Sequence, residues 1–599
     1  MTIAYAARVT GSLQKTSVDL SGLMRVLSEA LYSTPHVAIR ELVQNAHDSC
    51  TRRRLETRDE FTPAVQVTLA PGTLSIADNG AGLTDKEIHA YLATVGAGYT
   101  RTLRDGGMSD DLIGYFGLGF LSAFPISDRV EVWTCSCKQP CVAHRFVSRS
   151  GETYTVDVAE PRPIGTEVRL TLKSKFPESW DADVVLDRLR RYCCLLKHPV
   201  SFNGGAAVNT VPPWRLGNDV SALRKQKLSL EFARQFEPTF EPLVTFPVSG
   251  DGLDGLLWVQ DGASYATSDN RNVSVYIRGM QVSEDERDLL PRWAGFVGGI
   301  VDSHRLKPTA SRESLKKDDD YRAAADLLRE RLIAELSRLT KADPATWRRV
   351  RSRHNEALLG AAVVDEDLLA LVRDDVTVPT TEGDLTLPDL LKRGDGRIYV
   401  SQTAQASLES VLLRALGKPV VLGTRFAALT FCSRYLGDDQ DRLVHLGTRD
   451  GDQHVFRQPQ LGDEQVRNLQ AWFAGKDRQI LVRSFEPAFL PFALVTDRDA
   501  LLKQRLESDE ADRRIAQHVL MLARDFTRKL DAAAPVRMYV NSDSEVIRAL
   551  LEAPEPRRAE ALSLLQPLAL LVTDSQEQID LETSMTTFNA ALLRVLQGG

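Results

Sequence analysis

Three polar residues with helical spacing, Glu41, Asn45 and Asp48, are the part of this sequence best suited to chemistry. They stand at i, i+4 and i+7, so a helix would place them along one stripe, with apolar residues on another side. An amide oxygen can bind Mg²⁺ without adding negative charge beside phosphates, and a carboxylate one turn away can orient a water molecule. A solvated helix face has the same pattern, so the stripe alone leaves both interpretations open.

A second candidate site is the segment 78–83, which reads Asp-Asn-Gly-Ala-Gly-Leu and directly follows a predicted strand. The carboxylate of Asp78 could accept a hydrogen bond from an exocyclic amine such as N6 of adenine. Gly80 and Gly82 would let the backbone approach a flat base closely. The alternative is an ordinary turn in which the aspartate hydrogen-bonds its own backbone.

Two glycine-rich segments come next. Residues 95–107 are too polar for a core and too rich in glycine for a stable helix, so they predict a mobile loop that has either a lid role or none. Residues 113–122 read Ile-Gly-Tyr-Phe-Gly-Leu-Gly-Phe-Leu-Ser. This second segment lacks the third glycine of a dinucleotide-binding fingerprint, but its backbone N–H groups could cradle phosphates at the start of a helix.

Length and composition set the frame for these sites. The chain has 599 residues, enough for about three to five domains. Its net charge of −7 provides no electrostatic footprint for nucleic acid or an anionic membrane. We find neither a signal peptide nor an apolar run long enough to span a bilayer, and therefore expect a cytoplasmic protein.

The cysteines fit a reducing compartment. Cys135, Cys137 and Cys141 raise the question of zinc, with His144 three residues further on. Because a fourth ligand with suitable spacing is missing, thiols in a strand and its turn are the favoured interpretation. The adjacent pair at 193–194 is apolar in its surroundings and is predicted to lie in a core.

The elements that must position these residues follow from periodicity. The helix that carries the first stripe is predicted to run to about residue 58, with an earlier helix at 17–32. Alternating segments predict strands at 3–9, 65–69, 73–76, 129–134, 142–146, 168–172 and 273–277.

Four motifs in register resemble the Bergerat-type ATP-binding fold that Hsp90, DNA gyrase, MutL and histidine kinases share. They are the stripe 41–48, the segment 78–82, the glycine-rich loop 114–120 and the pair Gly165-Thr166. The local sequence resembles that of the Hsp90 family in particular, as at Ile39-Arg40-Glu41-Leu42. It continues beyond the nucleotide domain, at 288–293, 296–303 and 311–315. The likeness is dense to about residue 315, patchy to about 400 and thin afterwards.

The resemblance implies ATP and Mg²⁺ as cofactors and assigns roles to residues of this chain. Glu41 would polarise the attacking water, Asn45 would bind Mg²⁺, and Arg312 would reach the γ-phosphate from the next domain. The other expected nucleotide contacts are Asp48, Asp78, Gly80, Gly82, Gly114, Phe116, Gly117, Gly119, Phe120 and Thr166.

The same resemblance implies an α/β multidomain chain. An N-terminal Bergerat-type α/β sandwich would occupy residues 1–214, an α/β middle domain 215–460, and a smaller, mostly helical α+β dimerisation domain 461–599. An apolar stripe at Phe588, Ala591, Leu592 and Val595 fits a dimer interface, although it could equally pack on its own domain. The expected activity is that of a slow ATPase and chaperone that acts as a homodimeric clamp on partly unfolded client proteins.

Departures from the family keep alternatives open. The lid segment 95–100 lacks the usual lysine, for which Arg101 or Arg104 could substitute. A non-hydrolysing ATP sensor is therefore one alternative. A DNA-processing ATPase of the MutL or gyrase type is another, but the acidic balance argues against it. A histidine kinase would need a phosphoacceptor histidine before the ATP domain, and no histidine precedes His36. Residues 215–246 cannot be assigned to elements.

Overall fold

The structure is a computed structural model. It describes residues 35–57, 60–94, 112–113, 119–149, 151–174, 180–237, 239–262, 271–309, 314–402, 408–475, 478–497 and 536–571. The predictions for 3–9, 17–32, 95–107 and the stripe 588–595 lie outside these residues. The chain divides into two compact units, residues 1–350 and 351–599.

The first unit begins with a mixed sheet in the order β5-β4-β3-β6-β2-β1-β7, whose pairs are antiparallel except β1 with β7. The strands are β1 (Val65–Ala70), β2 (Thr73–Asp78), β3 (Ser127–Cys135), β4 (Ala143–Ser148), β5 (Tyr154–Ala159), β6 (Gly165–Leu172) and β7 (Val200–Phe202). The helices are α2 (Val37–Glu56), α3 (Asp85–Glu87), the π-helix η1 (Ile88–Leu92), the 3₁₀ turn η2 (Gly119–Ser122), α5 (Ala123–Ile126) and α6 (Ala182–Cys193). The strands predicted at 65–69, 73–76, 129–134, 142–146 and 168–172 are confirmed.

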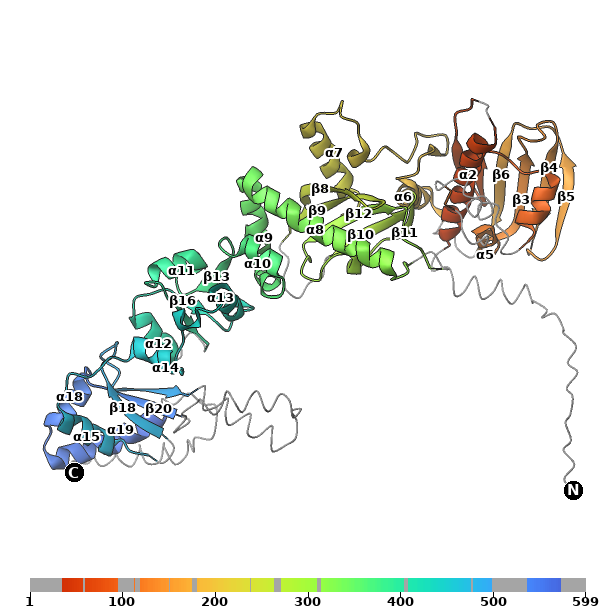
Figure 1. The fold of residues 1–599 in the computed structure, drawn as a ribbon. Coiled ribbons are helices and arrows are strands. Elements are labelled where there is room, and N and C mark those ends of the chain that lie inside the picture. Colours follow the sequence, from red (N-terminus) through yellow and green to blue (C-terminus); the bar gives the residue numbers. More distant parts are fainter. Residues whose placement is uncertain are drawn as a thin grey trace, which may run out of the picture. The chain divides into compact units, whose positions relative to one another are not determined.

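Helix α2 covers one face of this sheet (Figure 1). Its apolar side, formed by Ile39, Leu42, Val43 and Ala46, is buried in one core with the inward residues of β1, β2, β3 and β6. Burying four such side chains contributes several kcal/mol, at roughly 25 cal/mol per Å² of apolar surface. This packing fixes the rotation of α2 and so fixes where its polar stripe points.

A second mixed sheet, in the order β11-β10-β12-β9-β8, completes the first unit. Its strands are β8 (Pro242–Gly250), β9 (Leu253–Gln260), β10 (Asn272–Ile277), β11 (Met280–Ser283) and β12 (Val297–Ser303). Around it lie η4 (Pro213–Arg215), α7 (Ala222–Arg234), η5 (Arg287–Leu289) and the long helix α8 (Asp319–Ala342). The strand predicted at 273–277 is confirmed, and α7 and β8 occupy most of the segment that the sequence left unassigned.

Each of the two sheets in the first unit receives side chains into its core from segments next to the other sheet. Met280 of β11 lies in the core of the N-terminal sheet, whereas Cys194 and Leu195, which follow α6, lie in the core of the second sheet. The hydroxyl of Tyr276 on β10 donates to the backbone oxygen of Arg191. The predicted burial of the cysteine pair is confirmed, and Cys193 and Cys194 help to join the two sheets.

The second unit holds two smaller sheets, in the orders β14-β13-β16-β15-β17 and β18-β20-β19. Their strands are β13 (Thr377–Thr380), β14 (Gly383–Thr386), β15 (Ile398–Ser401), β16 (Val420–Leu422), β17 (Leu443–Val444), β18 (Arg478–Arg483), β19 (Phe492–Thr496) and β20 (Val536–Asn541). The helices are α9 (Pro344–Val364), which spans the division between units, α10 (Glu366–Val372), α11 (Leu387–Arg393), α12 (Leu408–Ala415), α13 (Ala428–Leu436), η6 (Gln440–Arg442), α14 (Arg449–Val455), α15 (Asp463–Trp472), α18 (Glu545–Glu552) and α19 (Glu555–Leu571).

Mixed α/β structure in both units confirms the predicted α/β multidomain class, while the boundaries at 214 and 460 stay predictions. Of the described helices, none combines the length and apolar character that crossing a lipid bilayer requires.

Candidate functional site

The polar stripe of helix α2 has one solvent-exposed residue between two buried ones. Asn45 is exposed, while the flanking carboxylates of Glu41 and Asp48 are only 2% and 5% exposed. An amide that faces solvent beside two buried carboxylates is a suitable oxygen donor for a hydrated Mg²⁺ ion. The helical spacing predicted from the sequence is therefore confirmed, and the three residues differ in accessibility.

The carboxylate of Glu41 lies against the backbone that ends the glycine-rich loop. A Cβ atom added to Gly119 would stand 2.6 Å from Glu41 Oε2, so a side chain at position 119 would displace the carboxylate from this place. On its other oxygen, Glu41 pairs with the adjacent Arg40, whose Nη2 lies 3.3 Å from Oε1. A buried carboxylate with one oxygen held by a cation can polarise a water molecule beside the glycine-rich segment.

Asp48 holds the start of that same loop. Its Oδ1 accepts a hydrogen bond of 2.9 Å from the backbone N–H of Ile113, and the ring of His47 lies 3.9 Å from the same atom. The contact joins α2 to the residue just before segment 114–118. Asp48 thus holds the backbone at Ile113.

The carboxylate of Asp78 is held at the end of β2 by donors from two elements. Its Oδ1 accepts from Ser49 Oγ on α2 and from the backbone N–H of Gly80, both at 2.8 Å. Burial raises the pKa of Asp78 to about 7, while the hydrogen bonds from Ser49, Gly80 and Thr166 and the charge of Arg52 act in the opposite direction. Near neutral pH this group is therefore poised between its two charge states.

The glycines around Asp78 serve close packing of the backbone. A Cβ at Gly80 would lie 2.3 Å from Ser49 Oγ and 2.6 Å from the backbone N of Cys50. At Gly82 it would lie 2.0 Å from the carbonyl oxygen of Cys135, and at Gly165 2.1 Å from that of Asp78. These contacts press the loop 78–82 against α2 on one side and against the ends of β3 and β6 on the other.

We expect Gly82→Ala to lower the free energy of unfolding by about 2–4 kcal/mol more than Gly72→Ala. Both glycines have a positive φ, +62° and +70°, so alanine strains the backbone similarly at each position. Only at Gly82 would the added carbon meet another chain segment, since nothing lies within 4 Å at Gly72. Denaturant unfolding of both variants measures the difference, and equal losses would show that backbone strain alone requires Gly82.

A threonine that the sequence did not single out organises the far side of this loop. Thr134, fully buried at the end of β3, accepts from the backbone N–H of Leu83 at 2.9 Å. Its hydroxyl also lies 3.0 Å from that of Thr166 and 3.3 Å from the carbonyl oxygen of Gly165. Thr134 thereby links Thr166 to Leu83, the residue that follows the predicted adenine contact Gly82.

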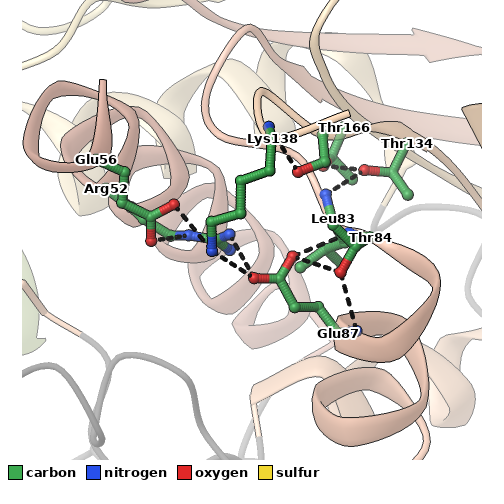
Figure 2. A network of polar contacts seen from close by, with 9 residues as sticks. Arg52, Glu56, Leu83, Thr84, Glu87, Thr134, Lys138 and Thr166 are labelled. Carbon is green, nitrogen blue, oxygen red and sulfur yellow. Dashed lines mark hydrogen bonds and ion pairs between the residues drawn. The ribbon is translucent and has the colours of Figure 1, made fainter. Parts of the chain in front are cut away.

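Figure 2 shows how this region is braced by charge. Arg52 on α2 donates to Glu56 at 2.8 Å and to Glu87 at 2.9 Å, and Lys138 lies 3.3 Å and 3.0 Å from the same two carboxylates. Glu87 in turn completes a capping box with Thr84 at the start of α3. These pairs link the end of α2 to the segment after Leu83, and so they hold the far end of the loop 78–83 in place.

Of the remaining predicted site residues, the structure describes Phe120 but not the others. The ring of Phe120 packs edge-on against Phe124 and Phe146 in the core, so a nucleotide contact at this position would use its backbone. Gly114, Phe116, Gly117 and Arg312 lie outside the described residues. The ends of the segment that holds Arg312 are close together, since the N–H of Thr309 donates to the oxygen of Ser314 at 2.9 Å.

Other expectations concern cysteine chemistry. Cys135 is buried, Cys137 is half-buried and Cys141 is exposed, and all are free thiols. Within the described residues, no three His, Cys, Asp or Glu side chains gather as a metal site would require. The chemistry of the residues around Asp78 and α2 fits a nucleotide with its magnesium ion. The amide of Asn45 is exposed, the carboxylate of Asp78 is oriented by hydrogen bonds, and the backbone at Gly80 and Gly82 leaves no room for a Cβ atom.

Comparison with known proteins agrees with this geometry. Residues 32–170 match the family described as histidine kinase-, DNA gyrase B- and HSP90-like ATPase, and residues 258–347 match the Hsp90 protein family. These two segments contain α2 with the Asp78 loop and most of the second sheet with α8.

Curated relatives include chaperone proteins HtpG from three bacteria. Identity is 26% over 415 residues for Chlorobium phaeobacteroides, 27% over 441 for Myxococcus xanthus and 28% over 417 for Rhodospirillum rubrum. These alignments cover 64%, 66% and 64% of this chain and 66%, 67% and 66% of the relatives. The chain thus spans about two thirds of the length of the curated relatives it matches. With an HSP90-like ATPase segment followed by an Hsp90 segment, and with HtpG chaperones among the proteins it matches, the chain is similar to the Hsp90 family of GHKL-class ATPases and to its HtpG members in particular.

Proposed function

We propose that this chain is an ATP-dependent molecular chaperone of the Hsp90 type, which binds ATP with Mg²⁺ in its N-terminal domain and hydrolyses it slowly. One observation supports the proposal: α2 carries the polar stripe 41–48 and also contacts the loop 78–82 after β2, the two segments to which we assign catalysis and base recognition. Ser49 bonds to that loop twice, through its hydroxyl to Asp78 and through its carbonyl oxygen to the N–H of Ala81 at 3.0 Å. Two turns earlier, the same helix holds Glu41 against Gly119.

The proposed roles follow the positions of these groups. Asp78 accepts the adenine amine, with Gly82 and Thr166 supporting the base, and Asn45 supplies an oxygen to Mg²⁺. Glu41 polarises the attacking water. The phosphates lie along the backbone N–H groups of the glycine-rich loop, at Gly114, Phe116, Gly117, Gly119 and Phe120.

The chaperone work that we propose is that of a clamp. Two protomers, joined through their C-terminal domains (461–599), close around a partly unfolded client when ATP binds, in the cytoplasm. Closure of the lid and of the middle domain (215–460) over the nucleotide domain (1–214) gates hydrolysis, which predicts slow turnover. The HtpG relatives, which carry the name chaperone, support this assignment.

Arg312→Ala is expected to lower kcat for ATP about tenfold and to change ATP affinity less than threefold. An arginine that arrives only in the closed state stabilises charge on the transferred phosphoryl group but contributes little to ground-state binding. Steady-state turnover and equilibrium titration with ATP measure the two effects. Arg322→Ala is the matched control, because Arg322 is an exposed arginine on α8 paired only with Asp319 among the described contacts. A loss of affinity equal to the loss of turnover would contradict this role.

The overall test combines nucleotide and client assays. The wild-type protein should hydrolyse ATP, an inhibitor that competes with adenine should stop hydrolysis, and aggregation of a heat-denatured client should fall only when ATP is present. Binding without measurable hydrolysis would favour an ATP sensor. Failure to bind ATP would overturn the proposal.

A further inference from the structure

Ser49 lies on α2 beside the loop 78–82, to which we assign recognition of the base. It stands one turn after Asn45 on α2, and its hydroxyl donates to Oδ1 of Asp78 at 2.8 Å. The N–H of Gly80 donates to the same oxygen at the same distance. Two donors on one carboxylate oxygen fix the orientation of the whole group, because the carboxylate of an aspartate has one torsion left once its Cγ is placed.

The surrounding backbone is built around this hydroxyl. A Cβ at Gly80 would stand 2.3 Å from Ser49 Oγ, so the absence of a side chain at position 80 makes the room that the hydroxyl occupies. The carbonyl oxygen of Ser49 accepts from the N–H of Ala81 at 3.0 Å. The segment after β2 is therefore joined to α2 at a single residue by both its backbone and its side chain.

We infer that Ser49 is a positioning residue that sets nucleobase specificity: it holds the Asp78 carboxylate so that the second oxygen receives the amine at position 6 of adenine. The inference rests on the proposed ATP-binding function and extends it to a residue that touches the nucleotide only through Asp78. Because the carboxylate in its ionised form only accepts hydrogen bonds, a purine with an oxygen at position 6 would meet an acceptor with an acceptor.

The electrostatics of the site agree with this role. Burial raises the pKa of Asp78, and the Ser49 hydroxyl is the strongest of the influences that lower it. The other groups that face the carboxylate are the backbone N–H groups of Gly80 and Thr166, the guanidinium of Arg52 and the thiol of Cys50. Removing the hydroxyl leaves less support for the ionised form, so the protonated form would persist to higher pH.

The test compares Ser49→Ala with wild type using two nucleotides, ATP and purine riboside triphosphate, which lacks the 6-amine. We expect affinity for ATP at pH 7.5 to fall about tenfold and affinity for the analogue to change less than twofold. The pH midpoint of ATP binding should also move upward. Thr57→Ala is the matched control, because the Thr57 hydroxyl bonds to the carbonyl oxygen of Arg53 at the end of the same helix, away from Asp78.

A second variant and the wild-type data keep the outcomes separate. Ser49→Cys retains the shape with a poorer donor and should give an intermediate loss; it carries the test if the alanine variant does not fold. Equal weakening of both nucleotides, or no weakening of either, would overturn the inference. If wild type bound ATP and the analogue equally, the inference would also fall, because no contact to the amine would exist. Wild type binding neither nucleotide would instead overturn the proposed function.

Discussion

Replacing Glu41 with alanine lowers the rate of ATP hydrolysis about a thousandfold and leaves ATP affinity within about threefold of wild type. Positioned general bases contribute roughly 10²–10⁴-fold to rate, and this carboxylate is the acidic group closest to the end of the phosphate loop among the described residues. Its burial also favours a large effect, because an ion that water does not screen polarises a bound water molecule more strongly. Turnover and equilibrium binding, measured on the same preparation, separate the two quantities.

The alanine variant has a second effect that the experiment must separate. Arg40 is buried and pairs with Glu41, so removing the carboxylate leaves a buried guanidinium without this partner and lowers the free energy of unfolding by about 1–3 kcal/mol. Glu41→Gln keeps an oxygen for Arg40 and should fold like wild type, yet it should hydrolyse ATP as poorly as the alanine variant. Glu60→Ala, which removes an exposed carboxylate shortly after α2, is the control. A glutamine variant with near-normal turnover would refute the role of Glu41 as the base.

The sequence predicted α2 well because helical periodicity is local. Residues 37–56 carry both an apolar side and a polar stripe, and the positions of Glu41, Asn45 and Asp48 follow from 3.6 residues per turn. The strand pair at 65–78 was equally accessible, because a tight turn at Pro71-Gly72 joins two alternating segments.

Contacts between distant segments could not be predicted in this way. Ser49 and Asp78 are 29 residues apart, and nothing in either local pattern indicates that a hydroxyl and a carboxylate meet. A partial signal existed, since Ser49 follows Asn45 by four residues and so extends the same stripe. Likewise, the hydrogen bond from Ile113 to Asp48 joins residues that are 65 positions apart.

Helix α7 escaped prediction for a different reason. Its apolar residues do not fall on one face: Phe232 is buried, but Leu223 is 78% exposed. The helix is fixed instead by its packing on β8 and β9 and by a cap in which Ser221 Oγ accepts from the N–H of Arg224. Tertiary packing stabilises such a helix, and a sequence with weak apolar periodicity does not predict it.

Asp78→Asn is expected to weaken ATP binding about a hundredfold or more and, in the same protein, to stabilise the fold. The amide oxygen can still accept from Ser49 and Gly80, which leaves the NH₂ group to face the adenine amine, donor against donor. Calorimetric titration measures the loss of affinity. Asp157→Asn, which removes an exposed carboxylate on β5, is the control for the change in charge.

The stabilising effect follows from the direction of the pKa shift. The pKa of Asp78 is about 7 in the folded protein, above the value of roughly 3.9 in an unfolded chain, so the folded state binds this proton more tightly. The stability that protonation provides is complete below about pH 4 and is lost as pH rises to about 7. Asp78→Asn removes this loss, so its free energy of unfolding should exceed that of wild type by about 2 kcal/mol at pH 8, and the advantage should shrink toward pH 4. Denaturant unfolding across this pH range tests the point, and a variant less stable than wild type at pH 8 would show that the carboxylate supports the fold. The proposed binding role gives a reason to keep an unfavourable buried charge at Asp78, because only the ionised carboxylate would present two acceptor oxygens, one to Ser49 and one to the base.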